Sequence, residues 1–109
     1  MKRYCLSVDL LDDPAKILEY EDLHRAVWPE ILDSIKVSGI LDMQIYRTGN
    51  RLCMIMETAD DFSFERKALL DKDNPDVQRW EEFMWDFQQP LPWAEPGQKW
   101  VLMEQIFQL

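Results

Sequence analysis

Two Asx-Pro pairs, Asp13-Pro14 and Asn74-Pro75, fix where the two main helical segments of this chain begin. An Asp or Asn side chain caps the free N–H groups of a first helical turn, and proline suits that turn because it has no N–H of its own. Before the first pair, residues 3–11 alternate between apolar and small or polar side chains, the pattern of a half-buried strand. Its predicted apolar face carries Tyr4, Leu6, Val8 and Leu10. The chain therefore opens with a strand that leads directly into a helix.

The first helix is predicted to run from Pro14 to about Val37, where Ser38-Gly39 supplies a stop signal. Pro29 lies inside this segment and cannot donate a backbone hydrogen bond. We therefore expect a kink or a local loosening of the helix just after His24.

The middle of the chain predicts a β-hairpin followed by a short helix. Residues 41–48 and 51–58 are strand-like, and Gly49-Asn50 between them suits a tight two-residue turn. Asp61 is then placed to cap a short helix over residues 62–72.

The last third predicts a helix, an irregular loop and a closing strand. Asn74 opens a helix that is expected to reach about Gln89. The proline-rich segment 90–97 cannot be regular, and residues 99–107 alternate as a strand.

The order of these elements, βαββαβ, is that of a ferredoxin-like α+β sandwich with an antiparallel sheet. The length of 109 residues fits one domain, residues 1–109. Helices cover only one face of such a sheet. A second copy of the chain is the simplest cover for the other face, so we expect a homodimer of the dimeric α/β-barrel type.

The composition narrows the possible partners. The net charge of −9 at pH 7 repels phosphate groups, which argues against nucleic-acid binding and against anionic membrane surfaces. No apolar run approaches the roughly 20 residues of a membrane span, and no secretory signal is evident, so we expect a cytoplasmic protein. Cys5 and Cys53 lack metal-binding spacing, and with a single histidine a zinc site is not expected.

His24, the only histidine, is the most informative candidate for chemistry. Tyr20 and Trp28 lie four residues to either side, so all three share one side of the predicted helix with an apolar set. That set is Ile17, Val27, Ile31 and Ile35. An imidazole exchanges protons near neutral pH. Aromatic faces together with hydroxyl groups bind sugars, so Tyr20 and Trp28 are candidate sugar-binding residues. Tyr46, Trp80 and Glu81 are further candidates.

Structural roles are also compatible with these residues. A lone histidine on an apolar helix face is often a satisfied core group, and Trp80 lies on a stripe at helical spacing that is typical of a core. Tyr46, beside the hairpin turn, fits a strand aromatic that packs across the sheet. Five tryptophans exceed what so small a core needs, and this favours a binding surface.

An ordered set of residues along nearly the whole chain resembles the rhamnose/fucose mutarotase family. The set comprises Tyr20-x3-His24-x3-Trp28-Pro29-Glu30, Ile45-Tyr46, Arg79-Trp80, Phe83-Met84 and Glu104-x2-Phe107. The resemblance implies a dimeric ferredoxin-like enzyme that interconverts the α and β anomers of L-rhamnose or L-fucose without a metal or an organic cofactor. A monosaccharide would then be the small-molecule partner.

The resemblance also implies roles for individual residues. His24 would be the acid/base catalyst, and Tyr20, Tyr46 and Trp80 would contact the sugar. Glu81 is a departure, because rhamnose-type members place a second tryptophan there. A carboxylate in place of a stacking surface makes L-fucose a strong rival to L-rhamnose, which is otherwise the expected substrate.

Two other readings share this architecture. Small dimeric α/β-barrel monooxygenases also place polar groups between helices and an open sheet, although one histidine offers little for haem. A non-catalytic binding domain would use His24 and the tryptophans only for packing.

Overall fold

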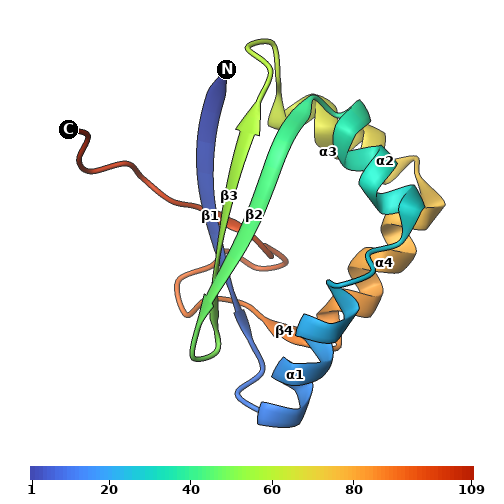
Figure 1. Ribbon diagram of the computed structural model, residues 1–109, viewed down its shortest axis with the longest axis vertical. Helices are drawn as coiled ribbons and strands as arrows, with labels where there is room; N and C mark the ends of the chain where they lie inside the picture. Colours follow the sequence, from blue (N-terminus) through green and yellow to red (C-terminus); the bar gives the residue numbers. More distant parts are fainter.

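The computed structural model describes residues 1–109 as one α+β domain with five strands and four helices. In chain order these are β1 (Lys2–Leu10), α1 (Pro14–Leu23), α2 (Pro29–Val37), β2 (Ile40–Thr48), β3 (Arg51–Thr58), α3 (Phe64–Lys72), α4 (Pro75–Trp85), β4 (Gln88–Gln89) and β5 (Val101–Leu102). The strands pair antiparallel in the order β2-β3-β1-β4, and β5 pairs with β1 as well. All helices lie on one side of the sheet (Figure 1). The predicted ferredoxin-like arrangement is confirmed, and none of the helices is long and apolar enough to cross a membrane.

The prediction of one helix up to Val37 is wrong, because two separate helices form, although the interruption lies just after His24, where a loosening was expected. α1 ends at Leu23 with His24 as its C-cap, and α2 begins at Pro29. Proline disfavours helical geometry in the residue before it, and Trp28 is accordingly extended, with φ −53° and ψ 132°. Pro29 therefore starts a helix instead of bending one, and His24 lies at a helix end.

Three other boundaries differ from the predictions. Ser63, not Asp61, caps α3, since its side chain accepts a hydrogen bond from the Arg66 N–H at 3.2 Å. α4 ends at Trp85, and Gln88 and Gln89 form β4 against β1. The closing strand is only β5, and the exposed tail 103–109 has no regular structure.

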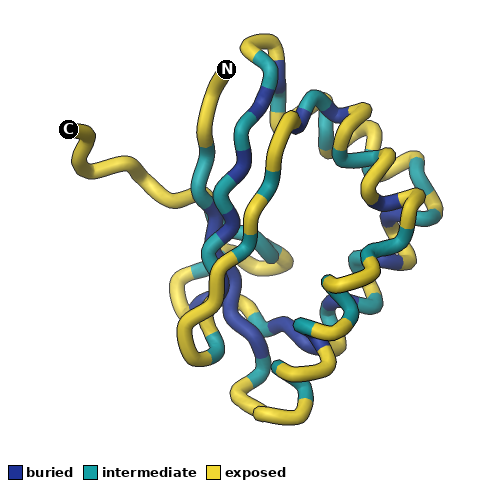
Figure 2. Tube along the Cα trace, in the orientation of Figure 1, coloured by how far each residue is buried: buried dark blue, intermediate teal, exposed yellow.

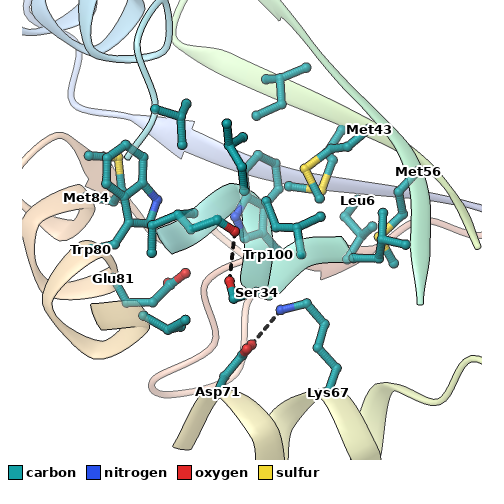
Figure 3. A pocket seen from close by; sticks show the side chains of 18 of the residues that line it. Leu6, Ser34, Met43, Met56, Lys67, Asp71, Trp80, Glu81, Met84 and Trp100 are labelled. Atoms are coloured by element: carbon teal, nitrogen blue, oxygen red, sulfur yellow. Dashed lines mark hydrogen bonds and ion pairs between the residues drawn. The ribbon is translucent and has the colours of Figure 1, made fainter. Parts of the chain in front are cut away.

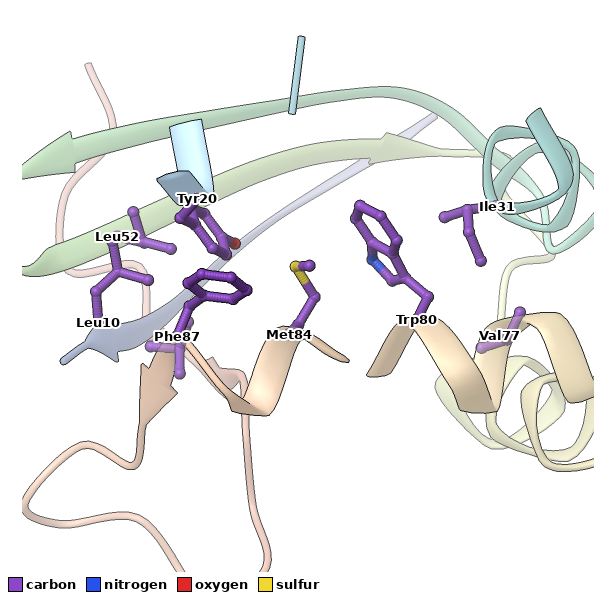
Figure 4. Packing of buried hydrophobic residues seen from close by; sticks show 9 residues of the cluster. Leu10, Tyr20, Ile31, Leu52, Val77, Trp80, Met84 and Phe87 are labelled. Carbon is purple, nitrogen blue, oxygen red and sulfur yellow. The ribbon is translucent and has the colours of Figure 1, made fainter. Parts of the chain in front are cut away.

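Two clusters of buried apolar side chains join the sheet to the helices. The larger contains Val8, Leu10, Tyr20, Ile31, Leu52, Val77, Trp80, Met84 and Phe87 (Figure 4). The smaller contains Leu6, Ile40, Met54, Met56 and Phe62. The predicted apolar face of β1 supplies residues to both clusters, and Figure 2 shows that burial concentrates along β1, β3 and the inward sides of the helices. The space between the layers is only partly filled.

Candidate functional site

A cavity of about 780 Å³ lies between the inner face of the sheet and the helices. Most of its lining is apolar, and Figure 3 shows Leu6, Met43 and Met56 gathered at one end. Away from these residues, Tyr20, His24, Glu81, Gln88 and Lys99 form a group of polar lining side chains that we call the polar end. Further polar lining residues are Ser34, Lys36, Asp42, Lys67 and Asp71. This volume lies within the range of about 300–1,000 Å³ that is usual for small-molecule sites. The cavity therefore presents an apolar wall beside a group of hydrogen-bonding side chains.

His24 contributes a neutral imidazole to the polar end. Its Nδ1 lies 2.8 Å from the backbone carbonyl oxygen of Tyr20. A carbonyl oxygen only accepts, so Nδ1 carries the proton and donates, and Nε2 of the neutral ring keeps a free lone pair. Burial lowers the pKa of His24 from its ordinary value, although the bond to the Tyr20 carbonyl partly opposes this. The ring is therefore prepared to accept a proton at Nε2.

The position of His24 follows from the break between α1 and α2. The last carbonyl groups of a helix lack intrahelical partners. Both the His24 backbone N–H and its Nδ1 reach the Tyr20 carbonyl, at 3.3 and 2.8 Å. The ring also lies against the Tyr20 ring, with centroids 4.2 Å apart. These contacts hold one tautomer in one orientation.

Tyr20 is a buried hydroxyl donor beside His24. Burial, opposed by a hydrogen bond from Gln88 and assisted by the negative charge of Glu81, raises the pKa of Tyr20 to about 12. The hydroxyl is therefore protonated at neutral pH. Gln88 Nε2 lies 3.3 Å from Oη of Tyr20 and donates to it, so the tyrosine proton is free to point elsewhere.

Trp80 lines the cavity, whereas Trp28 supports it from behind. The Trp80 ring meets His24 edge-on, with centroids 5.7 Å apart. Trp28 packs on Trp80 at 5.0 Å and stacks on Phe83, and it is absent from the cavity wall. Trp80 also belongs to the core, as its helical spacing predicted, and the same side chain forms part of the cavity wall.

Glu81 and Lys99 form an ion pair at the polar end of the cavity. The Lys99 Nζ lies 2.6 Å from Oε2 of Glu81 and 2.9 Å from the backbone carbonyl oxygen of the same residue. The same ammonium lies 4.8 Å from the centre of the Trp85 ring. Glu81 is thus held on the cavity wall by a cation from a loop 18 residues later.

The structure does not bring Tyr46 to the cavity, contrary to the expectation from the family resemblance. Its side chain is 58% exposed, and its hydroxyl lies 3.3 Å from Oε1 of Gln44. Alternate residues of a strand face opposite sides of the sheet, and Met43 and Ile45 of β2 take the cavity side. Tyr46 therefore lies on the face of β2 that points away from the helices.

Sequence reasoning did not propose most of the lining residues as site residues, and Gln88, Lys99 and Trp100 are among those it missed. Gln88 was assigned to a helix, and the other two to the start of a plain closing strand. The one signal in the sequence was Glu81, because a carboxylate beside an apolar helix stripe needs a cationic partner, and Lys99 is that partner. No group of three or more His, Cys, Asp or Glu side chains is arranged to hold a metal ion.

A neutral imidazole beside a protonated tyrosine, a tryptophan and a paired carboxylate, all on the wall of an open cavity, defines a small-molecule site suited to proton transfer on a polar ligand. The family model of L-rhamnose mutarotase matches residues 3–109. The chain belongs to the L-rhamnose mutarotase family, whose members are isomerases that act on sugars.

Individual relatives agree with this assignment. An L-fucose mutarotase from Xanthomonas campestris is 43% identical over 111 residues, which cover 100% of this chain and 89% of the relative. An L-rhamnose mutarotase from a Jannaschia species is 31% identical, over 88% of each chain. The crystal structure of an L-rhamnose mutarotase from Formosa agariphila superposes with a TM-score of 0.74 at 21% identity, covering 100% of this chain and 99% of that one. The last comparison supports the fold.

Proposed function

We propose that this protein exchanges the α and β anomers of a 6-deoxy-L-hexose, with His24 as the proton-transfer group. The observation that carries the proposal is the free lone pair on Nε2 of a neutral imidazole at the cavity wall. L-fucose is the first candidate and L-rhamnose the second. The relative that is 43% identical to this chain is named for L-fucose, and residue 81 is a glutamate.

The proposed reaction opens and recloses the pyranose ring. Nε2 of His24 takes the proton from the anomeric hydroxyl while the bond between C1 and the ring oxygen breaks. The imidazolium then returns this proton to the ring oxygen, which was bonded to the same carbon, and an open-chain aldehyde results. Rotation about the C1–C2 bond and the reverse transfers close the ring on the other face. The sugar therefore isomerises without gaining or losing atoms or electrons, and His24 returns to its neutral form.

The other polar groups would hold the sugar during these steps. Tyr20 keeps its proton and donates a hydrogen bond to a sugar oxygen, and Glu81 accepts one from a hydroxyl. Trp80 offers an apolar surface for ring C–H groups. The apolar end of the cavity, with Met43 and Met56, fits the methyl group that distinguishes a 6-deoxy sugar.

Saturation-transfer NMR on the anomeric protons of L-fucose and L-rhamnose tests this proposal directly. Wild-type protein should accelerate the exchange, and His24→Gln should lower the rate by about 10²–10⁴-fold. Arg25→Gln is a matched control, since Arg25 is exposed and lies next to His24 in the chain. Unchanged exchange by His24→Gln would refute the role of the imidazole, and no acceleration by wild type would refute the activity.

We also propose that the chain forms a homodimer through the sheet face opposite the helices. Figure 1 shows the C-terminal tail extending away on that side. Ile106 and Phe107 of the tail are 93% and 76% exposed, which leaves apolar surface that a second copy would cover. Sedimentation of wild type should give twice the chain mass, and Phe107→Asp should shift the distribution toward monomer. A monomeric wild type at micromolar concentration would refute the dimer.

A further inference from the structure

The side chain of Gln88 leaves one buried polar atom without a partner, next to the site described above. Gln88 is only 4% exposed and lies on the cavity wall. Its Nε2 donates to the Tyr20 hydroxyl, but its Oε1 has no hydrogen-bond partner within the protein. Buried polar groups are almost always paired, because an unpaired one loses its hydration without compensation. An orphaned acceptor in this position therefore points to a ligand.

Strand pairing directs Gln88 into the cavity. Gln88 stands opposite Leu10 in the register of β4 with β1, and Leu10 belongs to the inner core. Its neighbour Gln89 stands opposite Asp9, on the other face of the sheet. The chain thus offers two adjacent glutamines, of which only the first reaches the cavity.

The missing partner must be a hydrogen-bond donor, because a carbonyl oxygen only accepts. The nearby polar groups already define a hydroxyl-binding corner. The Tyr20 hydroxyl accepts from Gln88, which directs its own proton away from the amide. A sugar that takes the tyrosine proton would bind at Oη, which lies 3.3 Å from Nε2 of the same amide, so that a second hydroxyl of the sugar is the group expected to donate to Oε1.

We propose that Gln88 is a specificity-determining residue whose Oε1 accepts a hydrogen bond from one ring hydroxyl of the sugar. The proposal rests on the proposed function, since it assumes that a monosaccharide occupies the cavity. Gln88 and Tyr20 then act as a pair. The amide Nε2 donates to the tyrosine and so leaves its hydroxyl to donate to one sugar oxygen, while Oε1 of the same amide accepts a hydrogen bond from a second sugar hydroxyl. The protein would discriminate between sugars because a sugar that lacks this hydroxyl leaves Oε1 of Gln88 buried and unpaired in the complex.

The test combines a variant with a panel of sugars. Dissociation constants for L-fucose and its 2-deoxy, 3-deoxy and 4-deoxy analogues are measured by tryptophan fluorescence for wild type, Gln88→Met and the control Gln89→Met. Loss of one hydrogen bond should weaken L-fucose binding to Gln88→Met by about 2–10-fold. A second result is more decisive. One deoxy analogue should bind the wild type more weakly than L-fucose does, whereas Gln88→Met should bind this analogue and L-fucose with equal affinity. Gln89→Met should keep the wild-type pattern.

The outcomes separate this inference from the proposed function. If Gln88→Met shows the same loss of affinity as wild type for every deoxy analogue, Gln88 accepts no hydrogen bond from the sugar. The inference about Gln88 is then overturned, and the proposed function is unaffected. If the wild type neither binds nor exchanges L-fucose or L-rhamnose, both fail. The rise in Tm that saturating L-fucose produces is measured for each variant as well. A merely structural Gln88 would lower the Tm of the free variant and leave that sugar-induced rise intact.

Discussion

The ion pair between Glu81 and Lys99 is unequally buried, since the Lys99 side chain is 10% exposed and that of Glu81 is 45% exposed. Water can therefore reach the carboxylate but hardly the ammonium. The pair holds the loop before β5 against α4, and it places the one acidic group of the polar end beside the cavity. Family resemblance had implied a change of character at residue 81, and the structure supplies the compensating cation.

This asymmetry predicts unequal effects of removing the two partners. Glu81→Met leaves a buried ammonium with one backbone carbonyl oxygen as its hydrogen-bond acceptor and the Trp85 ring beside it, and we expect a loss of about 1–3 kcal/mol in the free energy of unfolding. Lys99→Met leaves a half-exposed carboxylate that water can solvate, so its loss should be smaller. Urea unfolding of both variants measures the difference, with the exposed neighbour variant Glu82→Met as control. Equal losses would show that the unequal burial of the two side chains does not determine the cost of removing them.

The lowered pKa of His24 predicts how activity and stability depend on pH. Because Nε2 must be unprotonated to accept a proton, the exchange rate should be constant above about pH 6.5 and fall as pH drops through the lowered pKa. Unfolded chains bind a proton at the ordinary pKa, near 6.5, before the folded protein does. The histidine therefore favours the folded state fully above that pH, and this contribution is lost as pH falls toward the folded pKa.

Comparison with His24→Gln isolates this contribution. The difference in unfolding free energy between wild type and variant should shrink as the pH is lowered from 7 to 5, and urea titrations at several pH values measure it. A difference that stays constant or grows over this range would show that the folded pKa is not lowered.

The placement of Tyr46 predicts that its hydroxyl is dispensable for anomer exchange. Tyr46→Phe removes only a contact to Gln44 on the sheet face away from the cavity, so the exchange rate should stay within about twofold of wild type. The NMR assay of anomer exchange measures this rate. A large loss from Tyr46→Phe would restore the role that the family resemblance implies.

Met43→Asp introduces a charge at the apolar end of the cavity and should raise KM, which the same NMR assay measures.

Local signals predicted most of the fold. The caps Asp13 and Asn74 both accept hydrogen bonds from the first turns of their helices, as the two Asx-Pro pairs indicated. The sequence also singled out His24, and the structure places its ring on the cavity wall. These features depend on residues within a few positions of one another.

Features that depend on distant segments could not be predicted in this way. Gln88 reaches Tyr20 across 68 positions of the chain. The face on which Tyr46 lies depends on the strand register, which shifts between Ile40 and Asp42 at an irregularity in β2. A shift of one residue exchanges the two faces of a strand, and no local pattern reveals it.

The start of α3 offers a sharp comparison between the predicted cap and the observed one. Ser63→Ala removes the acceptor for the Arg66 N–H and should lower the free energy of unfolding by about 1 kcal/mol. Asp61→Ala alters an exposed side chain that makes no hydrogen bond, so it should be nearly neutral. Both variants keep the buried Phe62 between them, and urea unfolding at constant pH measures the two losses. If Asp61→Ala proves the more damaging, α3 begins earlier than the hydrogen bond of Ser63 indicates.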